Sequence, residues 1–136
     1  MKPKKFNLNK ISNQLKKAWT PKEITKIDNF ILRIAKFDGE YHWHKHENED
    51  EIFIVFKGKI KIKTKKQDII LKKGEGIKIP KGVEHCPISL EPSFVLMFEP
   101  LKLKSKGKVT DISDTFGKLK RKVSGQEFKD MARAGR

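Results

Sequence analysis

The sequence predicts an all-β domain, an antiparallel sandwich or barrel of about six or seven short strands. Apolar runs rich in β-branched residues are separated by turn residues roughly every eight to twelve positions. Between these runs there is no convincing helical periodicity. The chain has 136 residues, which is enough for one domain with a buried core.

The N-terminal segment, residues 1–27, is expected to be a short helix or irregular and is rich in lysine. Ile11, Leu15 and Ala18 recur at a spacing that places them loosely on one helical face. A first strand is expected at residues 30–35, where apolar residues fall on both faces. Asp38-Gly39 then ends this strand with turn chemistry.

The later strands are expected at residues 51–56, 59–63, 69–71, 77–79 and 94–98. The first of these is dense in β-branched and aromatic residues. From Lys59 to Lys63, lysine alternates with isoleucine, which is typical of a strand with one face in solvent. Beyond residue 103 the chain is polar and basic. Residues 104–136 are therefore expected to form a tail, partly disordered or with a short helix.

The net charge of +15 is concentrated outside the predicted strands. Residues 1–30 carry +6 and residues 101–136 carry +7, whereas residues 31–100 carry only +2. Basic flanks could contact nucleic-acid phosphates, but the lysines are not interleaved with aromatic residues and no recognition motif is present, so nucleic acid is the less favoured partner. The single cysteine and the lack of a long apolar run favour a cytoplasmic protein without a membrane segment.

Four side chains have the pattern of a divalent metal site. His44 and His46 share a face if this stretch is extended, because side chains alternate along a strand. Glu51 has the opposite parity, so a bend within residues 47–50 must return it to that face. His85 follows a turn far along the chain and can join them only if the sheet folds back on itself. Imidazole and carboxylate ligands suit Zn, Fe, Mn, Ni or Co.

These residues also fit a known spacing. The pattern Gly39…His44-x-His46-x4-Glu51-x6-Gly58 resembles the first motif of the cupin family, and Gly74-x5-Pro80-x-Gly82-x2-His85 resembles the second. The resemblance implies a double-stranded β-helix, or jelly-roll, barrel over residues 28–103. It also implies one metal ion on His44, His46, Glu51 and His85, and a homodimer. Two departures are a spacing shorter by one residue before His44 and Ser89 where asparagine often ends the second motif.

The resemblance implies an enzyme that uses one divalent ion (Fe, Mn, Zn or Ni) on a small molecule, as an isomerase, an epimerase or a dioxygenase. Such short proteins are similar to those described as mannose-6-phosphate-isomerase-like. The alternative is a cupin that binds or senses a small ligand without turnover. No catalytic residue is identified, since Glu49 and Glu84 are near the ligands only in sequence.

Several other residues have structural interpretations. His42 shares parity with His44 but is expected at the rim, because the ligand set is complete without it. Cys86 should point away from the ligands and be structural. Trp19 and Phe30 are candidate anchors of a subunit interface. The alternative for the histidine cluster is a surface loop that captures nickel adventitiously and is no dedicated metal site.

Overall fold

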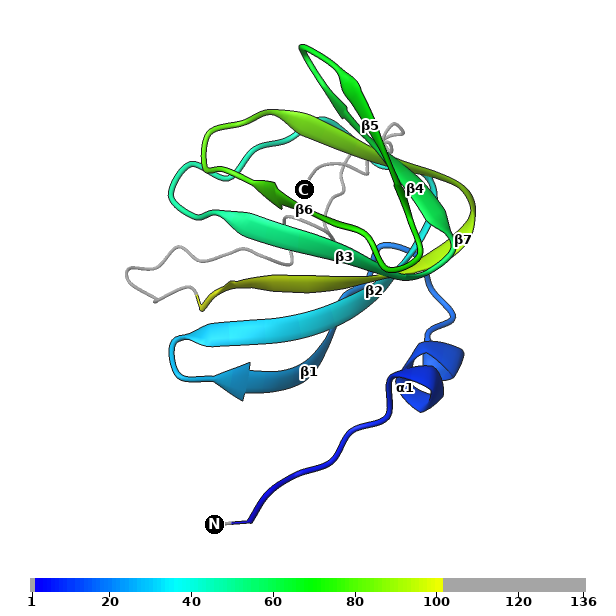
Figure 1. Ribbon diagram of the computed structural model, residues 1–136, viewed down its shortest axis with the longest axis vertical. Coiled ribbons are helices and arrows are strands. Elements are labelled where there is room, and N and C mark those ends of the chain that lie inside the picture. The colour runs from blue at the N-terminus through cyan, green and yellow to red at the C-terminus, as the bar shows by residue number, and fades with distance from the viewer. Residues whose placement is uncertain (1, 102–136) are drawn as a thin grey trace.

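The computed structural model describes residues 2–101, which form one short helix and seven antiparallel strands (Figure 1). The helix is α1 (Leu8–Gln14), and the strands are β1 (Lys22–Ile27), β2 (Phe30–Glu40), β3 (Glu51–Lys57), β4 (Lys59–Thr64), β5 (Asp68–Lys72), β6 (Gly76–Ile79) and β7 (His85–Pro100). This confirms the predicted all-β class. The expected tail at 104–136 lies outside the described residues. No helix within residues 2–101 is long and apolar enough to cross a membrane.

The strands form two layers that share β7. One layer has the order β1-β2-β7-β3-β6, and in the other β4 pairs with both β5 and β7. The first part of β7, residues 85–88, pairs with β4, whereas residues 94–98 lie between β2 and β3. One long strand therefore runs from one layer into the other and closes the barrel.

The core fills the space between the layers. Alternate residues of β3, Phe53 and Val55, are at most 1% exposed, and their neighbours Val95 and Met97 on β7 are fully buried. The lysine–isoleucine alternation of β4 is confirmed, because Ile60 and Ile62 are buried while the intervening lysines are not. Each buried side chain of this size contributes about 1.5–3 kcal/mol of hydrophobic stabilisation.

A serine pair holds the corner at which β7 changes layer. Ser89 and Ser93 are buried, and the Ser89 hydroxyl donates to Ser93 Oγ at 2.9 Å. The Lys59 N–H donates to Ser93 Oγ at 3.0 Å, which ties the corner to the turn between β3 and β4. Ser89, which stands in place of the more usual asparagine, therefore serves packing here. Gly58 in that turn has φ +95° and lies directly against Ser93.

The N-terminal segment contributes more to the barrel than its sequence predicted. Asn7 caps α1 by accepting from the Lys10 N–H at 2.9 Å. β1 was not expected; it is an edge strand with no buried residue, so its sequence lacks the alternation that marks a half-buried strand. The sheet consequently begins at Lys22, inside the segment 1–27.

Trp19, a candidate anchor of a subunit interface, makes contacts within its own chain. Its ring lies 4.4 Å from Phe37 and 4.7 Å from Tyr41, between ring centroids, and its indole N–H donates to the Asp38 carbonyl at 2.9 Å. Trp19 therefore packs against the chain's own core. Its partners come from β2 and the following loop, which the sequence around Trp19 does not reveal.

Candidate metal centre

Two of the predicted ligands are joined directly by their backbones. The His44 N–H donates to the His85 carbonyl at 3.0 Å, and the His85 N–H donates to the His44 carbonyl at 2.9 Å. Their imidazole centroids are 4.4 Å apart. This bridge is the fold-back that the sequence required, and it brings together residues from opposite ends of the two motifs.

The loop between His46 and β3 returns Glu51 to the same place. A bend at Glu47–Asn48 supplies the expected change of parity. Glu51 is then the first residue of β3 and only 2% exposed, with Oε1 lying 3.3 Å from His46 Nε2 and 4.0 Å from His85 Nε2. The Gly82 N–H donates to the His46 carbonyl at 2.7 Å, which fixes the other side of the loop. All four predicted side chains thus lie in one neighbourhood.

Backbone carbonyls orient two of the imidazoles. His44 Nδ1 lies 3.0 Å from the His42 carbonyl, and His85 Nδ1 lies 2.9 Å from the Val83 carbonyl. A carbonyl only accepts, so in these contacts Nδ1 carries the proton. The neutral ring then has its lone pair on Nε2, and the Nε2 atoms of His44, His46 and His85 are buried with both Glu51 oxygens. The sequence did not predict these two contacts, because backbone carbonyls carry no side-chain signal.

Imidazole Nε2 atoms in the acceptor form beside a carboxylate are a ligand set that suits a divalent transition metal. The carbonyls at Nδ1 are the kind of outer partner that holds metal-binding histidines in place. As the side chains stand, however, no three His, Cys, Asp or Glu residues among 2–101 are arranged to hold a metal ion. Binding would therefore require the rings and Glu51 to reorient toward a common centre.

His42 is half-buried beside this group. Its ring lies 4.0 Å from the Tyr41 ring and 5.5 Å from that of His44, between centroids. Tyr41 in turn meets the His44 ring edge-on at 5.4 Å. Through its carbonyl His42 orients His44, a role that does not depend on its imidazole.

The neighbouring ionisable groups have structural surroundings. The Lys81 N–H donates to Asp50 Oδ1 at 2.9 Å, and this bond, with the Lys78 ammonium 3.7 Å away, lowers the pKa of Asp50. Asp50 thereby links the loop before β3 to the turn after β6. Glu84 is exposed and pairs with Lys65 at 3.8 Å, so its position does not favour a role as base at the histidines.

Cys86 is fully buried on β7. Burial, with the Glu40 carboxylate nearby, raises the pKa of its thiol from 9.0 to about 12. A thiol held in the protonated form is a poor nucleophile, which agrees with the structural role predicted for Cys86.

Comparison with known proteins gives one family. A family model described as a cupin domain matches residues 31–98. A cupin-2 domain containing protein from Shewanella frigidimarina is 36% identical, with a TM-score of 0.69 over 70% of this chain and 93% of that chain. KdgF from Halomonas sp. is 26% identical, with a TM-score of 0.55 over 60% of this chain and 78% of that chain.

A protein from Neisseria meningitidis shares the fold with a TM-score of 0.67 at 24% identity, over 71% of this chain and 99% of that chain. No curated protein sequence gives a significant match to this chain.

Proposed function

This chain is a member of the cupin family, and from that premise we propose that it binds one divalent transition-metal ion through His44, His46, Glu51 and His85. With this ion, Fe, Mn, Zn or Ni, it acts on a small molecule. The ion would supply Lewis-acid chemistry, or redox chemistry if it is Fe or Mn. The protein supplies oriented ligands in a barrel that shields them from water.

One observation carries this proposal. His85 Nδ1 is committed to the Val83 carbonyl, so the Nε2 atom that faces Glu51 Oε1 at 4.0 Å is an acceptor. An acceptor nitrogen facing a buried carboxylate oxygen is repulsive unless a cation lies between them. A proton can serve one imidazole, but two imidazoles facing one carboxylate oxygen, with the His44 ring beside both, are better matched by a metal ion. Two such ligands of one ion, each bound at about 2.1 Å, lie about 3–4 Å apart, a range that includes the separations of Glu51 Oε1 from His46 Nε2 and His85 Nε2.

The alternative is a cupin that binds a metal or a small ligand without turnover. The exposed position of Glu84, 3.8 Å from Lys65, favours this alternative, because it leaves one of the two carboxylates considered as general base in solvent. Dioxygen uptake by the Fe- and Mn-loaded protein, measured with a substrate panel, separates an oxygenase from an isomerase. Absence of turnover across sugar phosphates, sugar acids and oxygenase substrates would favour the binding module.

A homodimer is part of the same proposal. The outward side chains of β3 and β7 are apolar: Ile54 pairs with Leu96, and Ile52 pairs with Phe98, whose ring stacks on Phe30 at 5.3 Å between centroids. Ile54 and Phe30 are 39% and 40% exposed. A contiguous apolar face of this kind is typical of a subunit interface.

The metal site is tested by metal content. The protein is purified without a histidine tag, and its metals are measured by mass spectrometry for the wild type and for His44→Ala combined with His85→Ala. We expect about one ion per chain in the wild type and less than about a tenth in the double variant.

His42→Ala is the matched control, since it removes an imidazole 5.5 Å from His44 and keeps the carbonyl that orients it. Stoichiometric metal in the folded double variant would refute the assignment. So would equal loss in His42→Ala.

A further inference from the structure

β5 and β6 are consecutive strands that diverge instead of pairing. In the described part of the chain, β5 pairs with β4 and β6 pairs with β3. The turn between them is fixed to β3, because the Gly74 N–H donates to the Val55 carbonyl at 2.8 Å and the Val55 N–H donates to the Glu75 carbonyl at 2.9 Å. From this fixed turn the two strands separate, as Figure 1 shows. The barrel wall is therefore open on this side.

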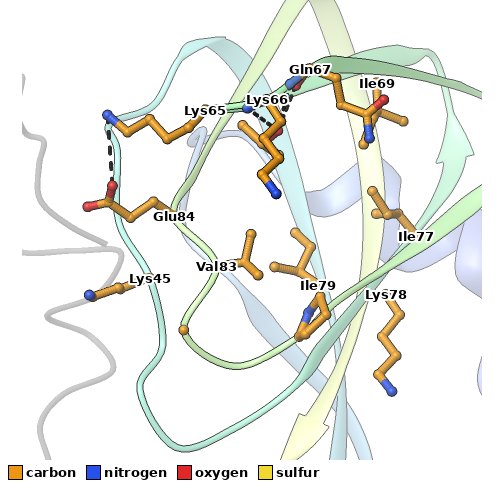
Figure 2. A pocket seen from close by; sticks show the side chains of 13 residues that line it. Lys45, Lys65, Lys66, Gln67, Ile69, Ile77, Lys78, Ile79, Val83 and Glu84 are labelled. Carbon is orange, nitrogen blue, oxygen red and sulfur yellow. Dashed lines mark hydrogen bonds and ion pairs between the residues drawn. The ribbon is translucent and has the colours of Figure 1, made fainter.

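A cavity of about 510 Å³ occupies the opening. Its floor consists of inward-facing apolar side chains: Ile69, Ile77, Ile79 and Val83 (Figure 2). Four lysines and one glutamate stand around it: Lys45, Lys65, Lys66, Lys78 and Glu84. The volume is that of a small-molecule site, and an apolar floor with a few charged groups is the usual composition of such sites.

Lys66 differs from the other three lysines. Lys45 lies 3.3 Å from Glu47, Lys65 3.8 Å from Glu84 and Lys78 3.7 Å from Asp50. Lys66 has no carboxylate within 4.0 Å in the part of the chain from 2 to 101. Figure 2 shows its side chain extending from the β4–β5 turn over the apolar floor. Lys66 thus presents a positive charge to whatever occupies the cavity.

The turn that carries Lys66 is held by one hydroxyl. Thr64 Oγ1 accepts from the N–H groups of Lys66 and Gln67 at 3.3 and 3.0 Å, and it donates to the Gln67 carbonyl at 2.8 Å. The backbone of Lys66 is therefore fixed before any ligand binds, which reduces the entropy that binding must overcome.

We propose that this cavity binds a small organic carboxylate, with its apolar body on the isoleucine and valine floor and its carboxylate at Lys66 Nζ. One ammonium matches the single charge of a carboxylate, whereas a phosphate dianion normally takes several donors. None of the four proposed metal ligands lines the cavity. The site can therefore be tested on metal-free protein, and its failure would leave the metal proposal untouched.

The test uses the full chain with ¹³C-methyl-labelled isoleucine and valine in the presence of EDTA, titrated separately with hexanoate, hexanamide and inorganic phosphate. We expect hexanoate to shift the methyl signals of Ile69, Ile77 and Val83 and to bind about three- to fivefold more tightly than hexanamide. Inorganic phosphate, which cannot cover the floor, should leave these signals in place.

Variants test whether the Lys66 ammonium binds the carboxylate and whether the turn at Thr64 positions it. Lys66→Met should remove the preference for hexanoate and leave hexanamide binding unchanged, whereas Lys73→Met, an exposed lysine outside the cavity lining, should change neither. Thr64→Val should weaken hexanoate binding by a smaller factor without affecting hexanamide. Equal affinities for the acid and the amide, persistence of the preference in Lys66→Met, or shifts confined to Ile70 and Ile88 on the outer face would overturn the proposal.

Discussion

Gly58 offers a direct test of how closely the β3–β4 turn meets the corner of β7. It has φ +95°, and a Cβ at this position would lie 2.6 Å from Ser93 Cβ and 2.8 Å from Ser93 Cα. The second of these atoms is backbone, so it cannot move aside by a rotamer change. Gly74 is the matched control: its φ is +88°, and a Cβ there would meet nothing within 4 Å.

The two alanine variants therefore share one cost and differ in another. Each alanine is held in the left-handed region, which costs about 1–2 kcal/mol. Gly58→Ala additionally forces overlap in a packed site, which typically costs about 1–3 kcal/mol more. We expect the free energy of unfolding to fall by about 1–2 kcal/mol in Gly74→Ala and by about 2–5 kcal/mol in Gly58→Ala.

Urea denaturation followed by tryptophan fluorescence measures both values, provided that the transitions have equal slopes. Heating gives a second measure, because an extra 1–3 kcal/mol lowers the Tm of a domain of this size by roughly 4–20 °C more. Gly58→Ala combined with Ser93→Gly should recover part of the difference. If the two single variants are equally stable within about 0.5 kcal/mol, the packing described at this corner is incorrect.

Two further predictions concern Cys86 and the outer face of the barrel. Because the folded protein holds the thiol proton up to a pKa of about 12, the unfolded chain loses it first, and stability should fall from about pH 9 upward. Above about pH 9, the free energy of unfolding of the wild type should fall by up to about 1.4 kcal/mol per pH unit more than that of Cys86→Ala, as measured by urea denaturation. If the free energies of the two proteins change in parallel with pH, the prediction is contradicted. Ile54→Asp should convert a dimer to a monomer in light scattering. Ile70→Asp, at a 55% exposed position on β5, should not, and a monomeric wild type would contradict the proposed interface.

The sequence was sufficient for the fold class and for the neighbourhood of the four predicted ligands. Short strands with clear alternation, such as β4, are local patterns and were predicted close to their observed bounds. His44 and His85 could be associated because both motifs carry characteristic glycine spacings. The bridge between them then follows from barrel closure.

Features without a local side-chain pattern were not predicted. β1 has no buried face, so nothing in Lys22–Ile27 distinguishes an edge strand from a polar loop. One strand was expected to begin at His85 and another to cover 94–98, but the structure joins them into the single strand β7. This strand continues through Pro87 and Pro92, residues that ordinarily indicate turns. The opening between β5 and β6 arises because β5 pairs with β4 and β6 pairs with β3. Side-chain patterns do not specify which strands pair.

The position of β7 in the chain has a consequence for synthesis. Both layers need this strand, and it is the last of the described strands to leave the ribosome. Until residues 85–100 have emerged, β2, β3 and β4 each lack a neighbour and expose apolar side chains at unpaired edges, a condition that favours aggregation. Closure must also join β2 to a strand about sixty positions later, and such long-range pairing is slow. We therefore expect the nascent barrel to be more prone to aggregation than a protein built from neighbouring hairpins.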